Sequence, residues 1–205
     1  TGVNMDYLYE QNALKAGYKT ICGIDEAGRG PLAGPVYAAA VILPLGLEIE
    51  GLNDSKKISE KKREQLFDVI CEKSIAYSIG IATEKEIDEI NILNATFLAM
   101  HRAVEGLNIK PDYALIDGNQ YPKIPMIMEE TVVKGDAKSM SIAAASILAK
   151  VSRDRFMLEK AKEYPQYQFE KHKGYGTKLH YEMLTEYGPS PIHRLSFLKK
   201  FYGEK

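Results

Sequence analysis

The chain has 205 residues, of which 45% are hydrophobic and 27% charged, and its formal net charge is −1. These values are typical of a soluble globular protein with one sizeable core, and they exclude a simple basic protein that coats nucleic acid. No apolar stretch of the sequence approaches the roughly 20 residues of a membrane span, and no secretory signal opens it, so we expect no membrane partner.

The charges are unevenly distributed along the chain. From Lys150 to the C-terminus there are 12 Lys and Arg against 7 Asp and Glu, a net of +5, which leaves −6 on the preceding part. An acidic body with a basic C-terminal quarter suits metal binding by carboxylates and polyanion binding by the tail, although a solvated charged face would look the same. Cys22 and Cys71 are far apart and form no metal-type pair, which favours a reducing, cytoplasmic setting.

The first half of the chain predicts a hairpin, a third strand and two helices. Glycine and proline interrupt the apolar runs of the hairpin, and residues with helix-capping side chains precede both helices. The expected elements are strands at 21–24 and 36–43 around a turn at 28–35, a helix capped by Ser59, a strand at 75–82, and a helix from about Asn91 to Glu105 after the capping box of Thr83 and Glu86.

The second half of the chain alternates strands with helices. We expect a strand at 113–116, a strand at 131–134 that leads into a turn, and a long helix from Ser141 to about Tyr164. The helix begins with a run of alanine, which permits close approach to a sheet, and Pro165 ends it. Strands that are first antiparallel and later alternate with helices predict a mixed α/β class.

Acidic residues follow three of these strands at the point where each strand ends. Asp25 and Glu26 follow the first strand, Asp117 follows the strand at 113–116, and Asp136 follows the last one. Each motif alone is compatible with a surface pair, a turn or a helix cap. If the strands are neighbours, however, four carboxylates gather at one edge and can hold two divalent cations, as in two-metal phosphoryl transfer. The segment 23–30 thus predicts half of a metal-dependent phosphodiesterase site, and the joint pattern of the acids favours a two-metal site over the separate interpretations.

Several motifs, in order along the chain, resemble those of the bacterial ribonuclease HII family, the type 2 ribonuclease H family. They cover most of the chain between about residues 19 and 197. The motifs are GIDEAGRGPLAGPV at 23–36, NDSK at 53–56, IDGN at 116–119, KGDAKS at 134–139, SIAAASILAKVSRD at 141–154, HKGYGT at 172–177 and HRLSF at 193–197.

This resemblance implies a ribonuclease H-like fold, with a mixed sheet flanked by helices and a small helical C-terminal subdomain. The expected parts are a lead-in at 1–18, a catalytic domain at 19–163 and an extension at 164–205 that completes the substrate site. The implied enzyme hydrolyses the RNA strand of RNA/DNA hybrids and nicks 5′ to ribonucleotides embedded in duplex DNA, leaving 5′-phosphate and 3′-hydroxyl ends. It uses two divalent ions, Mg²⁺ or Mn²⁺, and acts as a monomer.

The resemblance also implies roles for individual residues. The metal-binding, catalytic acids are Asp25, Glu26, Asp117 and Asp136, and the residues expected to touch substrate are Gly28, Arg29, Gly30, Tyr175, Lys56 and Ser139. The glycine-framed loop would sense the ribose 2′-hydroxyl through its backbone, which agrees with the 2′-hydroxyl being the handle that separates RNA from DNA. Tyr175 would pack on the next sugar, and Lys56 and Ser139 would contact phosphates.

Some further residues of these motifs have weaker assignments. Arg194 and Lys173 are weaker candidates for phosphate contacts, and Asp154 is expected to form a structural salt bridge rather than bind metal. No pair of histidines has metal-ligand spacing, and His101 is expected to be an ordinary helix residue.

Two alternative functions remain open at this point. Another nuclease of the same fold, such as a junction resolvase or transposase, would keep the clustered acids without the Gly-Arg-Gly loop and Tyr175. A non-catalytic nucleic-acid-binding module would require at least one of the four acids to be replaced, and all four are present.

Overall fold

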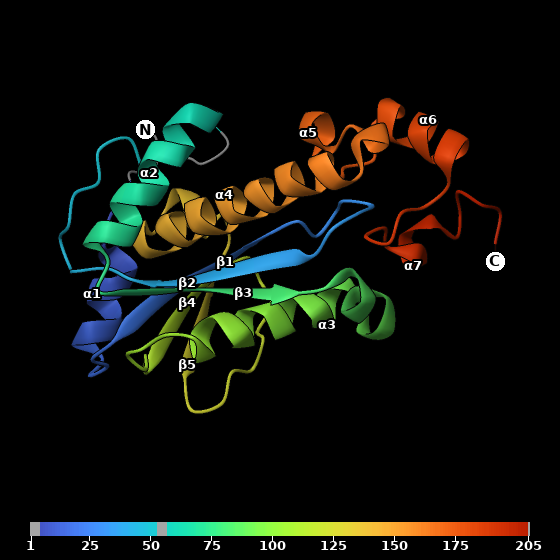
Figure 1. The fold of residues 1–205 in the computed structure, drawn as a ribbon. Coiled ribbons are helices and arrows are strands. Elements are labelled where there is room, and N and C mark those ends of the chain that lie inside the picture. Colours follow the sequence, from blue (N-terminus) through green and yellow to red (C-terminus); the bar gives the residue numbers. More distant parts are fainter. Residues whose placement is uncertain (1–4, 53–56, 205) are drawn as a thin grey trace.

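The computed structural model describes residues 5–52 and 57–204, and a mixed five-stranded sheet lies at its centre (Figure 1). The strand order is β3-β2-β1-β4-β5, in which β1, β2 and β3 pair antiparallel while β4 and β5 continue parallel to β1. The strands are β1 Ile21–Ala27, β2 Val36–Ile42, β3 Ala76–Ala82, β4 Tyr113–Asp117 and β5 Met128–Val132. The predicted hairpin and mixed α/β class are confirmed.

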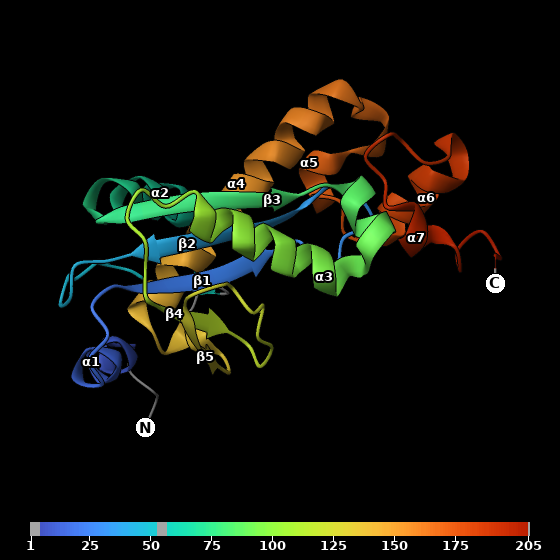
Figure 2. The same ribbon diagram turned by 90° about the horizontal axis from the view of Figure 1, so that it is seen from below.

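Helices cover both faces of the sheet (Figure 2), and all seven residues of β2 are buried, alternately on one face and the other. Ala38 and Ala40 belong to the apolar cluster under α3 (Glu84–Glu105). Ala39 and Val41 belong to the cluster formed with α4 (Met140–Glu163) and α2 (Glu60–Lys73). Because successive strand residues point to opposite faces, an all-apolar strand such as β2 requires cover on both sides. The architecture is therefore three-layered.

The long central helix α4 (Met140–Glu163) lies directly against β1. A Cβ atom on Gly23 would come within 2.2 Å of the backbone carbon of Ser141, so only glycine permits this approach. The alanines at the start of α4 are completely or almost completely buried against the sheet. The close approach that the alanine-rich segment predicts is confirmed, and it brings the start of α4 beside the end of β1.

Several element boundaries differ from those that the sequence predicts, and the first strand continues through Asp25 and Glu26 to Ala27 instead of ending at Ile24. The helix expected from about Asn91 begins at Glu84, and Asn91 instead interrupts it with φ 71° and ψ 167°, while its side chain accepts a hydrogen bond from the Asn94 amide. The capping box of Thr83 and Glu86 therefore starts a first helical segment that a break separates from the second. The last strand lies at Met128–Val132 rather than 131–134, because Lys134 already adopts a left-handed conformation with φ 55°.

The remaining short elements are a helix near the N-terminus, a 3₁₀ helix just before α4, and a set of short C-terminal helices beyond the end of α4 (Figure 1). They are α1 Leu8–Lys15, the 3₁₀ helices η2 Gly135–Ala137 and η3 Pro165–Tyr167, and the helices α5 Phe169–His172, α6 Lys178–Tyr187 and α7 Leu195–Leu198; α2 spans Glu60–Lys73. No helix among the described residues combines the length and apolar character needed to cross a membrane. The division at residue 163 into a catalytic domain and an extension stays a prediction.

Candidate active site

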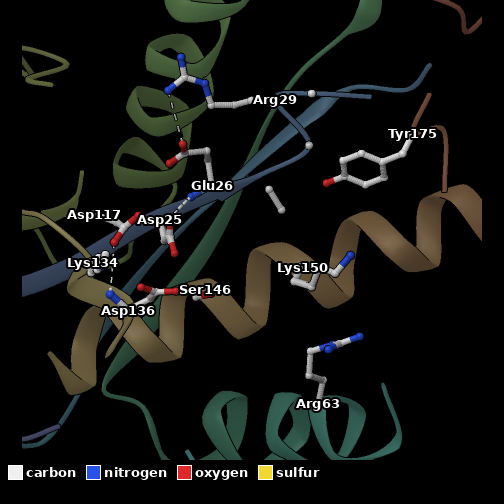
Figure 3. A pocket seen from close by; sticks show the side chains of 13 residues that line it. Asp25, Glu26, Arg29, Arg63, Asp117, Lys134, Asp136, Ser146, Lys150 and Tyr175 are labelled. Atoms are coloured by element: carbon white, nitrogen blue, oxygen red, sulfur yellow. Dashed lines mark hydrogen bonds and ion pairs between the residues drawn. The ribbon is translucent and has the colours of Figure 1, made fainter. Parts of the chain in front are cut away.

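A pocket of about 530 Å³ opens at the C-terminal end of β1 and is drawn in Figure 3. Its lining combines acidic side chains from three segments with basic side chains, a glycine loop and one tyrosine. The lining residues are Asp25, Glu26, Ala27, Gly28, Arg29, Gly30, Arg63, Asp117, Lys134, Asp136, Ser146, Lys150 and Tyr175. The pocket thus contains all four predicted catalytic acids and four of the six predicted substrate residues.

The sheet topology brings the acids together. Strands β1 and β4 are parallel neighbours with Ile24 opposite Ile116, so the acid that follows each of these residues lies at the same edge. Asp136 reaches this edge from the 3₁₀ turn after β5, and its backbone N–H donates to Asp117 Oδ1 at 3.2 Å. The expectation that the acid-bearing strands are neighbours is confirmed for β1 and β4, and β5 lies next to β4.

Asp25 is buried and Glu26 is partly buried, both in a negatively charged environment. Asp25 is only 5% exposed, and burial followed by the charges of Glu26, Asp117 and Asp136 raises its pKa well above the usual range. Burial also raises the pKa of Glu26, although the Arg29 guanidinium, 3.7 Å from Glu26 Oε1, acts in the opposite direction. The second carboxylate oxygen of Glu26, Oε2, is buried without a hydrogen-bond partner. An added positive charge would therefore stabilise this site.

The donor set fits divalent metal ions. Among the described residues, no three His, Cys, Asp or Glu side chains converge closely enough to form a ready-made metal cluster, so the four acids line the pocket without meeting at one point. Their mutual repulsion favours this spread. Carboxylate oxygens are the ligands that Mg²⁺ and Mn²⁺ prefer, and the buried, unpartnered oxygen of Glu26 is a free donor of that kind.

The Gly-Arg-Gly loop lies beside the acids and is held from behind by buried arginines. Gly28 has φ 93°, and a Cβ atom there would lie 2.1 Å from Arg153 Nε, so the position requires glycine. The carbonyl groups of Gly28 and Arg29 accept hydrogen bonds from the Arg194 guanidinium at 2.6 and 2.9 Å. A Cβ atom on Gly30 would have Tyr175 Cε1 as its nearest neighbour, at 3.8 Å. The loop therefore presents a fixed backbone next to the tyrosine.

Tyr175 stands at the far side of the pocket from the acids (Figure 3). It belongs to the irregular segment between α5 and α6, and its residue is 41% exposed. The ring lies 5.7 Å from the Arg153 guanidinium carbon and 6.0 Å from Lys150 Nζ, measured to the ring centroid. An exposed ring backed by cations can accept a flat apolar face such as that of a sugar.

Five lining residues were not among the predicted site residues, and one of them, Ala27, simply follows Glu26 at the end of β1. Ser146 and Lys150 are one helical turn apart on α4, a spacing that identifies one face of the helix, whereas Arg63 comes from α2 and Lys134 from the turn after β5. Only the packing of α2 on α4 brings Arg63 to the pocket, so no local signal identified it. Basic side chains thus surround an acidic centre, an arrangement suited to binding a phosphate backbone.

The other two predicted substrate residues are Lys56 and Ser139. Lys56 lies outside the described residues. Ser139 is completely buried, where its hydroxyl donates to Glu10 Oε1 at 2.6 Å and accepts from the Ile142 amide as the cap of α4. These contacts occupy the hydroxyl, so the arrangement does not support the predicted phosphate contact.

The weaker assignments have mixed outcomes. The candidate phosphate contact of Arg194 is wrong for this structure, because its guanidinium is buried and bonded to backbone carbonyls. The structural salt bridge of Asp154 is confirmed, since Lys150 Nζ lies 3.1 Å from Asp154 Oδ1. His101 is a helix residue of α3, as expected, and its Nε2 is 2.7 Å from the Pro122 carbonyl.

Comparisons with known proteins agree on one family. A family model described as Ribonuclease HII matches residues 22–200. The chain is 57% identical over 199 residues to Ribonuclease HII of Caldicellulosiruptor saccharolyticus, covering 97% of both proteins. It is 60% identical over 194 residues to Ribonuclease HII of Acetivibrio thermocellus, covering 95% of this chain and 75% of that protein.

Solved structures of related proteins share the fold. The crystal structure of ribonuclease H2 from Pyrococcus horikoshii superposes with a TM-score of 0.73 at 28% identity, covering 91% of this chain and all of that one. The ribonuclease HII in a complex with PCNA from Archaeoglobus fulgidus gives 0.71 at 25% identity, covering 86% and 94%. A Bst ribonuclease HIII solved in complex with Mn²⁺ gives 0.69 at 16% identity, covering 90% and 69%, a likeness of fold alone.

Proposed function

The chain belongs to the ribonuclease HII family and is a ribonuclease with a ribonuclease H-like fold, and we propose that its acidic pocket hydrolyses the RNA strand of RNA/DNA hybrids and nicks 5′ to ribonucleotides embedded in duplex DNA. The observation that carries this proposal is the meeting of four acids, the Gly-Arg-Gly loop and Tyr175 in one pocket. The products carry 5′-phosphate and 3′-hydroxyl ends.

Asp25, Glu26, Asp117 and Asp136 would hold two divalent ions, Mg²⁺ or Mn²⁺. When bound, such ions supply an activated water and stabilise the leaving oxygen of an in-line displacement. The protein itself contributes the buried, like-charged oxygens of Asp25 and Glu26, which favour cations over water. Arg29 offsets part of the negative charge on Glu26 at 3.7 Å.

The other side of the pocket accounts for substrate selection. The loop at Gly28 and Gly30 has no side chain to keep a sugar away, so its backbone can read a 2′-hydroxyl. Tyr175, next to Gly30, would pack on the following sugar, where a deoxyribose leaves room for the ring. Lys150 and Arg63 line the same pocket and would contact phosphates.

The proposal extends to the organisation of the chain. Residues 19–163 would form the catalytic domain, and residues 164–205 would complete the substrate site by contributing Tyr175 and by supporting the glycine loop through Arg194. The enzyme would act as a monomer in the cytoplasm on hybrid and ribonucleotide-containing duplexes.

A gel assay on three duplexes tests the proposed function. The substrates are DNA with one embedded ribonucleotide, a continuous RNA/DNA hybrid and all-DNA, each incubated with Mg²⁺, with Mn²⁺ or with EDTA. We expect metal-dependent nicks on the 5′ side of the ribonucleotide and intact all-DNA. Asp136→Asn should lose cleavage while binding the same duplexes. Cleavage of all-DNA, or of nothing in either metal, would contradict the proposal.

Tyr175→Ala tests the sugar-packing assignment separately. The side chain is largely at the surface of the pocket, so its removal should slow cleavage at a single ribonucleotide much more than it affects the melting temperature. An unchanged rate at the single ribonucleotide would show that the ring does not contact the sugar.

A further inference from the structure

Three buried histidines form a cluster behind Tyr175 that the proposed chemistry does not use. His172, His180 and His193 are at most 7% exposed and surround the ring of Phe169. The rings of His172 and His180 stack 4.2 Å apart, and Nε2 of His180 lies 2.8 Å from Nε2 of His193. Buried imidazoles in direct contact must have matched donors and acceptors, so their proton positions can be deduced.

The hydrogen bonds allow one arrangement of protons from His193 to Tyr175. His193 Nδ1 accepts from the Ser190 amide at 2.9 Å, so the ring carries its proton on Nε2 and donates to His180 Nε2. His180 then carries its proton on Nδ1 and donates to the carbonyl oxygen of Tyr175 at 2.8 Å. Burial lowers the pKa of His180 to about 4 and that of His193 to about 3, so both rings are neutral at neutral pH.

Arg194, which follows His193 in the sequence, holds the Gly-Arg-Gly loop, the part of the proposed substrate site that faces Tyr175. Arg194 is completely buried, and its guanidinium donates to the carbonyls of Gly28, Arg29 and Gly34 at 2.6, 2.9 and 2.8 Å. Its backbone N–H donates to the Leu32 carbonyl at 2.8 Å. The side chain of Arg194 is therefore a clamp on the backbone of the Gly-Arg-Gly loop.

A second set of backbone bonds joins the two halves directly. The Leu32 amide donates to the Gly174 carbonyl at 2.8 Å, and Ala33 forms an isolated antiparallel bridge with His193. The segment that carries Tyr175 contains left-handed residues at Lys173 and Gly174, with φ 52° and 92°, which need such support to persist. Arg194 thus bonds the loop directly, whereas His193 reaches the Tyr175 segment through His180.

From these contacts we propose that His193, through His180, and Arg194 are positioning residues that fix the spacing between Tyr175 and the Gly-Arg-Gly loop and thereby set the preference for a single ribonucleotide over a continuous hybrid. This inference rests on the proposed function, in which the loop reads the ribose and Tyr175 packs on the next sugar. A long hybrid offers many ribonucleotides that can be placed at the site in different positions along the strand. A single ribonucleotide must instead fit the loop while the next sugar fits the Tyr175 ring. Misplacement of the ring therefore penalises the single-ribonucleotide substrate more.

The test compares two variants of His180. His180→Leu removes the donor to the Tyr175 carbonyl, while His180→Asn keeps an amide N–H near the position of Nδ1. We expect His180→Leu to lower the ratio of single-ribonucleotide to hybrid cleavage by about tenfold or more, and His180→Asn to recover most of it. Arg194→Lys should lower the same ratio, because an ammonium group cannot bond three carbonyls in the fixed fork of a guanidinium.

His101→Leu is the matched control, because His101 also bonds a backbone carbonyl through its ring but lies outside the pocket. It should leave the ratio unchanged. A ratio equal to that of the wild type in folded His180→Leu, or equal losses on both substrates, would overturn the proposal. A wild-type protein that cuts neither substrate would instead overturn the proposed function.

A measurement of proton positions tests the proposal without catalysis and applies even where His180→Leu fails to fold. Nitrogen-15 NMR of the wild-type histidines should show His180 protonated on Nδ1 and His193 on Nε2 at pH 7. The opposite tautomer at His180 would remove the hydrogen bond to Tyr175 and overturn the positioning role.

Discussion

The acidic pocket and the histidine cluster both contain buried titratable groups, but the two regions differ in whether the polar atoms of these groups have hydrogen-bond partners. In the cluster, both ring nitrogens of His172, His180 and His193 have hydrogen-bond partners. In the pocket, Glu26 Oε2 is buried without one, and carboxylate charges raise the pKa of Asp25. Buried groups whose hydrogen bonds are all made within the protein stabilise the surrounding structure. Buried groups that keep uncompensated charge require a bound ligand of opposite charge.

The largest effect expected from this difference is the loss of catalysis in Asp25→Asn. The amide has nearly the same shape and can still accept the 2.8 Å bond from the Glu26 amide, but it lacks the charge that binds a metal ion. We expect cleavage of both the hybrid and the single-ribonucleotide duplex to fall by about 10³-fold or more, because metal-ion stabilisation amounts to several kcal/mol. Steady-state rates in saturating Mg²⁺ measure it, and a loss below tenfold would show that Asp25 is not a ligand.

Divalent ions should stabilise the folded protein through the same pocket. An ion that binds only the native state at about 100 times its Kd adds about 2.7 kcal/mol to the free energy of unfolding. The melting temperature should therefore rise with Mg²⁺ or Mn²⁺ and return to its starting value with EDTA. Asp117→Asn should blunt the rise, whereas His101→Leu should retain it. An equal rise in Asp117→Asn would indicate binding elsewhere.

The histidine cluster should respond to pH in the direction of a group buried in its neutral form. The folded pKa of His180 is about 4 against an ordinary value of 6.5, so its stabilisation is complete above about pH 6.5 and is lost as the pH falls toward 4. In that range the unfolded chain binds the additional proton, which costs about 1.4 kcal/mol per pH unit for one histidine. Urea denaturation at pH 7, 6 and 5 should show a flatter dependence for His180→Asn than for the wild type. Parallel curves would contradict the assignment.

The arrangement of the acids in the pocket could be predicted in part from the sequence. The strand-end position of the acids follows from short apolar runs that stop at Asp25 and Asp117, and adjacent parallel strands then place them together. The sequence places the last strand too far along the chain, because Glu129 and Glu130 in β5 interrupt the apolar pattern that indicates a strand. The Glu129 carboxylate accepts hydrogen bonds from the Lys123 and Ile124 amides. The hydrophobic periodicity of the sequence cannot reveal such contacts.

The histidine cluster could not be predicted, because its members are joined only by tertiary contacts. His172, His180 and His193 lie in three separate short segments without metal-ligand spacing. Helix α1 was missed for a similar reason. Its buried face includes the charged side chain of Glu10, which contacts Ser139 instead of forming an apolar stripe. Hydrophobic patterns therefore located the strands and long helices, while buried polar contacts had to be seen in three dimensions.

The smallest expected effect separates the two regions most directly, because it has opposite signs in them. Without divalent ions, Asp25→Asn should be more stable than the wild type at pH 7, since it removes one buried charge from a group of like charges. The sign follows from a folded pKa above the unfolded one: protonated Asp25 contributes stability at low pH, and that contribution is lost as the pH rises through the folded pKa. His193→Phe should instead destabilise, because it leaves His180 Nε2 and the Ser190 amide without their partner. Urea denaturation midpoints in EDTA measure the stability of both variants. Destabilisation by Asp25→Asn would show that contacts within the protein already compensate the charge of Asp25.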